Sequence, residues 1–96
     1  MLIERNKLEP NIRTLKLISG EEIICKVISN NDKDIVIKYP LLFVISNNDK
    51  LSNDVVFCPW VISMDFESEI SIQHKNILAN ILPSKIAMEK YIESIG

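Results

Sequence analysis

Histidine and cysteine are scarce in this 96-residue chain, which has one histidine and two cysteines. A zinc site needs about four such ligands close together, whereas Cys25 and Cys58 stand far apart, each alone inside an apolar run. We therefore expect two reduced thiols that act as small apolar side chains. The sequence predicts no metal site and no cofactor. It also shows no nucleophile–base pair, paired acids or phosphate-binding loop, so we predict no catalytic residue and no enzyme.

Long apolar runs are also absent. The longest stretches, such as YPLLFVI at residues 39–45, are too short to cross a bilayer. The first ten residues mix charged with apolar side chains, which is unlike a secretory signal. The sequence therefore predicts a cytoplasmic protein that has no contact with a membrane.

The chain has no excess of positive charge either, because 11 Lys and Arg stand against 13 Asp and Glu, for a formal net charge of -2. This balance excludes attraction of the whole surface to nucleic acid, so any contact with a polyanion must come from a local patch. The 47% of apolar and 25% of charged residues are typical of a folded chain. Residues 1–96 are enough for one domain with one core.

The sequence does contain a series of strand patterns separated by turn signals. Residues 12–29 predict two strands around a turn at residues 19–21. The polar turn at residues 30–34 leads into a long apolar strand that has Pro40 in its middle. Because proline donates no hydrogen bond to a neighbouring strand, we expect a bend, a bulge or a sheet edge there.

A second proline, Pro59, lies at a similar distance beyond the next turn. We expect residues 39–46 and 55–63 to pair as an extended hairpin with residues 47–54 at its tip. Two prolines at the same level predict that both strands bend together, as at the corner of a small barrel. An acidic bend at residues 64–69 follows.

The last strand is apolar on nearly both faces, with Ile77 and Ile81 on one side and Leu78 on the other. A strand in a small antiparallel domain usually buries one face and exposes the second. The second apolar face therefore predicts pairing with another copy of the chain at an open sheet edge. A head-to-tail contact of this kind that closes makes a ring.

The C-terminal residues predict a helix over about residues 84–95, with Ser84 as its N-cap. The apolar positions that approximate helical spacing are Ile86, Met88 or Glu89, Ile92 and Ile95. With strands over about residues 12–83, the pattern predicts a mainly β fold. We expect a small, strongly bent five-stranded antiparallel barrel of the SH3 type, with an extended hairpin of strands 3 and 4 and a short C-terminal helix.

The segment LKLISGEEIICKVISNNDKDIVIK at residues 15–38 resembles the first motif of the Sm-like family. Gly20 stands at the first glycine of that motif, and Cys25 stands where a second glycine is usual. The segment ISIQHKNILANILPS at residues 70–84 resembles the second motif, and more closely its version in the bacterial RNA chaperone Hfq. His74, Lys75 and Asn76 occupy the places of the tyrosine, lysine and histidine of that version.

The chain is most similar to Sm-like proteins of marine phage and metagenomic origin, and a phage origin implies the host cytoplasm. They share the LKL-x-x-GEE motif, a YPLLFVI-like strand, the proline–tryptophan pair at Pro59 and Trp60, and a short C-terminal helix. The resemblance spans about residues 12–91.

This resemblance implies a homo-oligomeric ring of about five to seven subunits that binds single-stranded RNA. In such rings the turn after the second strand and the turn before the last strand meet near the central pore. Amide groups suit base edges, lysine suits phosphate, and histidine stacks or donates. The implied RNA-contacting residues are Asn30, Asn31, Asp32, Gln73, His74, Lys75 and Asn76. The implied subunit contacts are Ile77, Leu78, Ile81 and Trp60.

The first of these turns lacks the aromatic residue that is usual in the family, and with it about 1–3 kcal/mol of stacking energy per base. Two functions therefore stay open. One is a ring that binds single-stranded RNA weakly at its inner rim, as an RNA chaperone or regulator. The alternative is a structural or adaptor ring that binds proteins and has lost RNA binding, which the acidic net charge and the extended hairpin favour.

Overall fold

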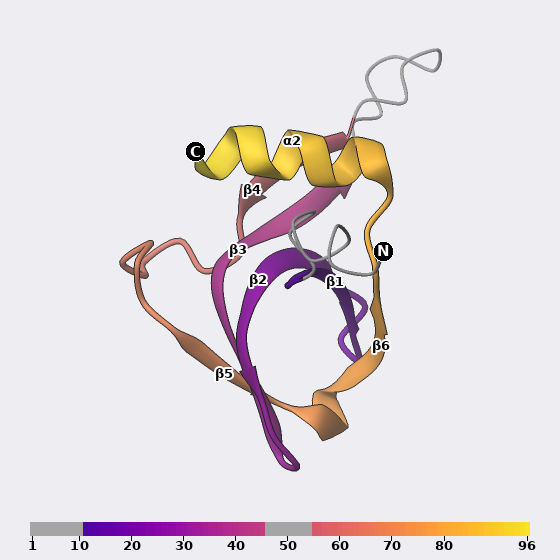
Figure 1. The fold of residues 1–96 in the computed structure, drawn as a ribbon, viewed down its shortest axis with the longest axis vertical. Helices are drawn as coiled ribbons and strands as arrows, with labels where there is room; N and C mark the ends of the chain where they lie inside the picture. Colours follow the sequence, from indigo (N-terminus) through magenta and orange to yellow (C-terminus); the bar gives the residue numbers. More distant parts are fainter. Residues whose placement is uncertain (1–10, 46–54) are drawn as a thin grey trace, which may run out of the picture.

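The computed structural model describes residues 11–45 and 55–96, which form antiparallel strands and a C-terminal helix (Figure 1). The described strands are β1 (Ile12–Leu17), β2 (Glu22–Asn30), β3 (Asp34–Ile45), β4 (Val55–Pro59), β5 (Ile70–Gln73) and β6 (Ile77–Ile81). A 3₁₀ turn, η1 (His74–Asn76), joins β5 to β6, and helix α2 (Lys85–Ile95) ends the chain. The predicted mainly β fold with a C-terminal helix is confirmed.

The strands form one strongly curved sheet in the order β4-β3-β2-β1-β6. β5 pairs with β3 over residues 34–37, and β4 pairs with β3 over residues 41–45. The sheet does not close, since within the described residues β4 and β6 each pair on one side only. The sheet has six strands where five were predicted, because η1 divides the last predicted strand into β5 and β6.

The division of β3 between two partners occurs at Pro40, where the sequence predicted a bend. Tyr39 has a positive φ of 52°, a conformation that costs about 1–3 kcal/mol in a residue other than glycine. The register of β3 with β2 shifts between Ile24 and Lys26, at the same level. The predicted bend is therefore confirmed, and the missing N–H of the proline explains why the regular ladder stops there.

The two prolines of the hairpin lie at the same level, as predicted. Leu41 pairs with Pro59, and the Trp60 N–H donates a hydrogen bond of 3.4 Å to the Pro40 carbonyl. The second arm is shorter than predicted because β4 ends at Pro59, so residues 60–63 lie outside the strand. The predicted tip, at residues 47–54, lies outside the described residues.

Apolar side chains cover both faces of the curved sheet. The interior cluster comprises Leu15, Leu17, Ile23, Cys25, Ile35, Ile37 and Ile72. The outer cluster lies under α2 and comprises Ile12, Ile24, Leu41 and Tyr91. Burying each large side chain contributes about 1.5–3 kcal/mol. The helix therefore covers the second apolar face of β1, β2 and β3.

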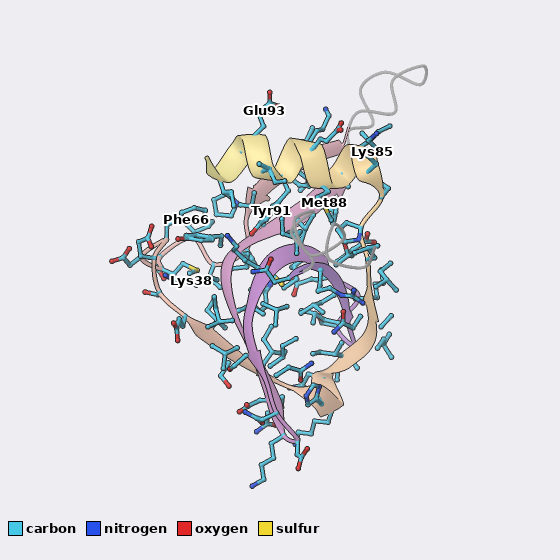
Figure 2. The ribbon with its side chains drawn as sticks, viewed as in Figure 1. Lys38, Phe66, Lys85, Met88, Tyr91 and Glu93 are labelled. Atoms are coloured by element: carbon cyan, nitrogen blue, oxygen red, sulfur yellow. The ribbon has the colours of Figure 1, made fainter. Side chains whose placement is uncertain are left out.

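Helix α2 begins where the sequence predicted, since the Ala87 N–H donates to Ser84 Oγ at 3.1 Å. This bond satisfies one of the unpaired N–H groups of the first turn. Figure 2 shows Tyr91 and Met88 between the helix and the sheet, whereas Glu93 points away.

The predicted apolar face of α2 is wrong at two positions. Ile86 is 67% exposed and Ile92 is 42% exposed, while Tyr91 is fully buried and Met88 and Ile95 pack beside it. The predicted apolar spacing omits Tyr91, which is the largest fully buried side chain among the described residues. Its hydroxyl donates a 2.6 Å hydrogen bond to the Tyr39 carbonyl, which makes burial of the polar end possible.

Candidate nucleic-acid interface

The β2–β3 turn and the η1 turn meet at the bottom of the molecule as drawn in Figure 1. Pairing of β5 with the start of β3 places Gln73 opposite Asp34. The next residue, His74, donates its backbone N–H to the Lys33 carbonyl at 2.9 Å. The structure thus brings together the two turns in which the sequence placed the RNA contacts.

Side-chain hydrogen bonds fix the shape of these turns. Asn31 Oδ1 accepts from the N–H groups of Lys33 at 2.9 Å and Asp34 at 3.0 Å, as in an Asx turn. His74 Nε2 lies 2.8 Å from the Asn31 carbonyl. A carbonyl only accepts, so Nε2 carries the proton and Nδ1 of the neutral ring remains an acceptor. Asn31 therefore shapes the turn, and its amide oxygen is not available to read a base.

A hollow of about 390 Å³ lies between the turns, which we name the turn hollow. Its lining residues are Asp32, Lys33, Gln73, His74 and Lys75. Neither lysine makes an ion pair within the described part of the chain. The hollow thus combines two ammonium groups and one carboxylate with an amide and an imidazole, the groups that contact phosphates and base edges.

Three of the predicted RNA-contacting residues do not line the turn hollow, and Asn31, which shapes the β2–β3 turn, is one of them. Asn30 lines a separate hollow together with Arg13 and Asn80. Asn76 lines another one beside Trp60, and its carbonyl accepts from the Ile18 N–H at 2.9 Å. The β-bulges in β2 and the 3₁₀ turn rotate these side chains away, and alternation in the sequence cannot reveal such rotations.

Lys33 is the residue that the sequence reasoning left out. It belongs to the predicted turn, but lysines in polar turns are usually solvated, so its residue type alone carried no signal. The hydrogen bond from the His74 N–H to its carbonyl and the shared lining of the turn hollow show that Lys33 adjoins the second turn.

The predicted subunit contacts fall into two groups. Ile77 and Trp60 pack against the interior cluster, and the Trp60 Nε1–H donates to Glu21 Oε1 at 3.2 Å. Leu78 and Ile81 are instead 66% and 53% exposed on the edge strand β6. Leu78 lies at a bulge, since Leu17 pairs with Ile77 and Lys16 pairs with Ala79. The open edge of β6 therefore exposes apolar side chains.

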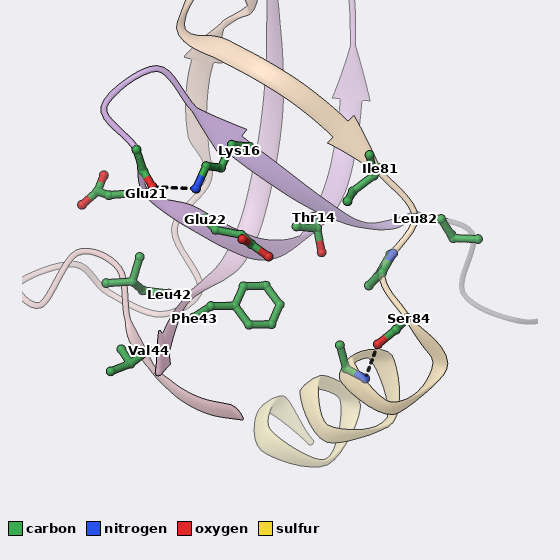
Figure 3. Close-up of a pocket in the computed structure, with 13 residues that line it drawn as sticks. Thr14, Lys16, Glu21, Glu22, Leu42, Phe43, Val44, Ile81, Leu82 and Ser84 are labelled. Atoms are coloured by element: carbon green, nitrogen blue, oxygen red, sulfur yellow. Dashed lines mark hydrogen bonds between the residues drawn. The ribbon is translucent and has the colours of Figure 1, made fainter. Parts of the chain in front are cut away.

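A larger hollow of about 620 Å³ lies on the outer face of the sheet beside the start of α2 (Figure 3). Its walls include Phe43 and Leu82, and its charged residues are Lys16, Glu21 and Glu22. Lys16 Nζ donates to the Gly20 carbonyl at 3.0 Å. Because two carboxylates stand against one ammonium group, this hollow disfavours a polyanion.

The cysteines contribute no reactive group to either hollow. Both are free, Cys25 is fully buried, and burial raises the pKa of its thiol to about 12. A thiol with such a pKa stays protonated and unreactive. Among residues 11–45 and 55–96, no three metal-ligating side chains form a cluster, and no helix is long and apolar enough to span a membrane.

The chain matches no protein-family model and no curated protein.

Proposed function

We propose that the protein forms a homo-oligomeric ring that binds single-stranded RNA weakly through the turn hollow. The observation that carries this proposal is the meeting of Lys33 and Lys75 at one hollow, fixed by two hydrogen bonds of His74 to the β2–β3 turn. Ammonium groups attract phosphates, and the Gln73 amide and the free nitrogen of His74 suit the edges of unstacked bases.

Binding at one turn hollow is weak because its lining includes no aromatic ring apart from the imidazole. Base stacking on an aromatic side chain is worth about 1–3 kcal/mol, so its loss is large compared with the remaining contacts. A ring repeats the hollow by symmetry. Each bound site then raises the effective concentration of RNA at the next site, and several weak contacts together hold one strand.

Pairing of β6 with β4 of the next subunit builds the proposed ring. Within the described residues both strands have one unpaired edge. β6 exposes Leu78 and Ile81, and β4 exposes 46% of Val56. Open apolar edges of this kind favour addition of another strand. The resemblance to Sm-like proteins supports about five to seven subunits.

Fluorescence anisotropy with short U-rich and A-rich RNAs at low salt tests this function. Replacing both lysines of the turn hollow (Lys33→Ala, Lys75→Ala) should raise Kd at least about tenfold, since each lysine neutralises a phosphate. The matched control, Lys85→Ala with Lys90→Ala, removes the same charge from exposed positions of α2 and should change Kd less than about twofold.

Two results would contradict RNA binding at the turn hollow. One is the absence of binding by the unmodified protein at low salt. The other is an equal loss of affinity in both double variants, because net charge alone would then explain the binding.

A specific observation favours an adaptor ring as the second candidate function. In the segment between β4 and β5, Ile62 is 90% exposed and Phe66 is 39% exposed, next to the exposed acids Asp65 and Glu67. Exposed apolar side chains with an acidic rim suit a protein partner better than RNA. A stable oligomer in light scattering that shows no RNA binding would favour this candidate.

A further inference from the structure

A second polar hollow, of about 280 Å³, lies at one open end of the curved sheet, and we name it the Arg13 hollow. Its lining residues are Asn11, Arg13, Val27, Asn30, Ile35 and Asn80. Arg13 lies on the same face of β1 as Leu15 and Leu17, which are buried in the interior cluster. Its guanidinium therefore lies on the interior side of the sheet, at the end where the apolar core stops.

Two hydrogen bonds hold the guanidinium of Arg13 in one orientation. Its Nε–H donates to Asn80 Oδ1 at 2.8 Å, and its Nη2 donates to the Asn80 carbonyl at 3.2 Å. A guanidinium has five N–H donors, so most remain available. No acidic side chain lines the Arg13 hollow, and Arg13 makes no ion pair within the described part of the chain. Among the described residues, this fixed positive charge therefore has no counter-ion.

Amide groups surround this charge. The Asn30 side chain makes no hydrogen bond within residues 11–45 and 55–96, and the Asn80 side chain uses its oxygen for Arg13, which leaves its N–H₂ group as a donor. Asn11 is held in place because its carbonyl accepts from the Val27 N–H at 2.7 Å. The hollow therefore offers several N–H donors and a positive charge over an apolar floor.

We propose that the Arg13 hollow binds a single oxyanion group, a phosphate or a carboxylate, with Arg13 as the charged donor and Asn30 and Asn80 as amide donors. A guanidinium matches two oxygens of such a group and makes charge-assisted hydrogen bonds. Because Asn80 already orients the guanidinium, little side-chain entropy is lost on binding. The Arg13 hollow shares no lining residue with the turn hollow, so this inference is independent of RNA binding there.

NMR of the side-chain N–H groups tests this site directly. The probes are inorganic phosphate, acetate and uridine 5′-monophosphate, titrated at constant ionic strength. We expect saturable shifts of the Arg13 Nε–H and of the Asn30 and Asn80 N–H₂ signals. The Arg13→Gln variant should raise Kd at least about tenfold. The control Lys85→Gln, which removes the same charge from an exposed position of α2 outside both hollows, should leave Kd within about twofold.

A second variant keeps the proposal testable if loss of the bond to Asn80 disturbs β6. Asn30→Ala leaves the Arg13–Asn80 hydrogen bonds in place and should raise Kd about threefold to tenfold. Shifts that grow linearly with every probe, or the unmodified affinity in both Arg13→Gln and Asn30→Ala, would overturn the inference. Saturation by phosphate and the nucleotide but not by acetate assigns a phosphate ligand, and saturation by acetate alone assigns a carboxylate.

Discussion

Replacing Tyr91 with phenylalanine removes one hydroxyl from the outer cluster and should destabilise the fold. Tyr91 is fully buried, and its hydroxyl donates to the Tyr39 carbonyl at 2.6 Å. Tyr39 has a φ of 52°, a conformation that strains the backbone at the bend of β3. The hydrogen bond therefore joins α2 to this strained bend. Two ring contacts support the same region, Tyr39 with Phe66 at 5.0 Å and Phe57 with Tyr91 at 6.4 Å between centroids.

The loss follows from the worth of one buried hydrogen bond. Such a bond contributes about 0.5–1.5 kcal/mol, and an acceptor left without a partner costs about 1–3 kcal/mol. We therefore expect Tyr91→Phe to lower the free energy of unfolding by about 1–2 kcal/mol. In a chain of 96 residues, each 1 kcal/mol corresponds to about 4–8 °C, so Tm should fall by about 5–15 °C.

Thermal unfolding followed by circular dichroism, with urea unfolding at 25 °C, measures this loss. The matched control is Ser94→Ala, because Ser94 Oγ donates to the Lys90 carbonyl at 2.8 Å within α2 and makes no bond to the sheet. We expect a change below about 0.5 kcal/mol for Ser94→Ala. A Tyr91→Phe variant that unfolds like the unmodified protein would refute the role given to this bond, and so would an equal loss in the control.

Burial raises the pKa of the Cys25 thiol from 9.0 to about 12 and also raises the pKa of the Tyr91 hydroxyl. Both groups lose their protons at lower pH in the unfolded chain than in the folded protein. Their contribution to the free energy of unfolding is therefore complete below about pH 9 and falls as the pH rises, by about 3 kcal/mol at pH 11 for Cys25. Cys25→Ala should therefore flatten the urea-unfolding free energy between pH 8 and 11; an unchanged slope would contradict the burial of the thiol. Leu78→Lys should convert the proposed ring to monomers in light scattering, because a charge would enter the β6 edge contact. Leu82→Lys places the same charge one residue beyond the end of β6 and tests whether the contact extends past the strand. A monomeric unmodified protein at micromolar concentration would rule out the ring.

The strands were predictable where apolar alternation is regular and turn signals bound it. β1, β2 and the two prolines of the hairpin follow directly from this pattern, and Ser84 predicted the start of α2. Four consecutive polar residues, 73–76, interrupt the apolar alternation between β5 and β6, and the chain forms the 3₁₀ turn η1 there. The hydrogen bond from the His74 N–H to the Lys33 carbonyl holds this turn against the β2–β3 turn, and local sequence cannot predict that contact.

The two hollows depend on tertiary contacts that no local pattern contains. The resemblance to Sm-like proteins predicted which turns meet, but not that Asn31 would be used to shape its own turn. Arg13 has the same parity as Leu15 and Leu17, so its interior side could be read from the alternation. Within residues 11–45 and 55–96, the absence of an acidic partner for Arg13 depends on residues far away in the chain, and alternation says nothing about them.

Photo-crosslinking of the unmodified protein to a short RNA that contains 4-thiouridine, followed by mass spectrometry of the peptides, tests RNA binding at the turn hollow most directly. We expect cross-links within residues 31–33 and 73–75, reduced at least about fivefold by Lys33→Ala with Lys75→Ala but not by Lys85→Ala with Lys90→Ala. Cross-links confined to α2 or to residues 61–69, or none above the background of a protein that does not bind RNA, would contradict it.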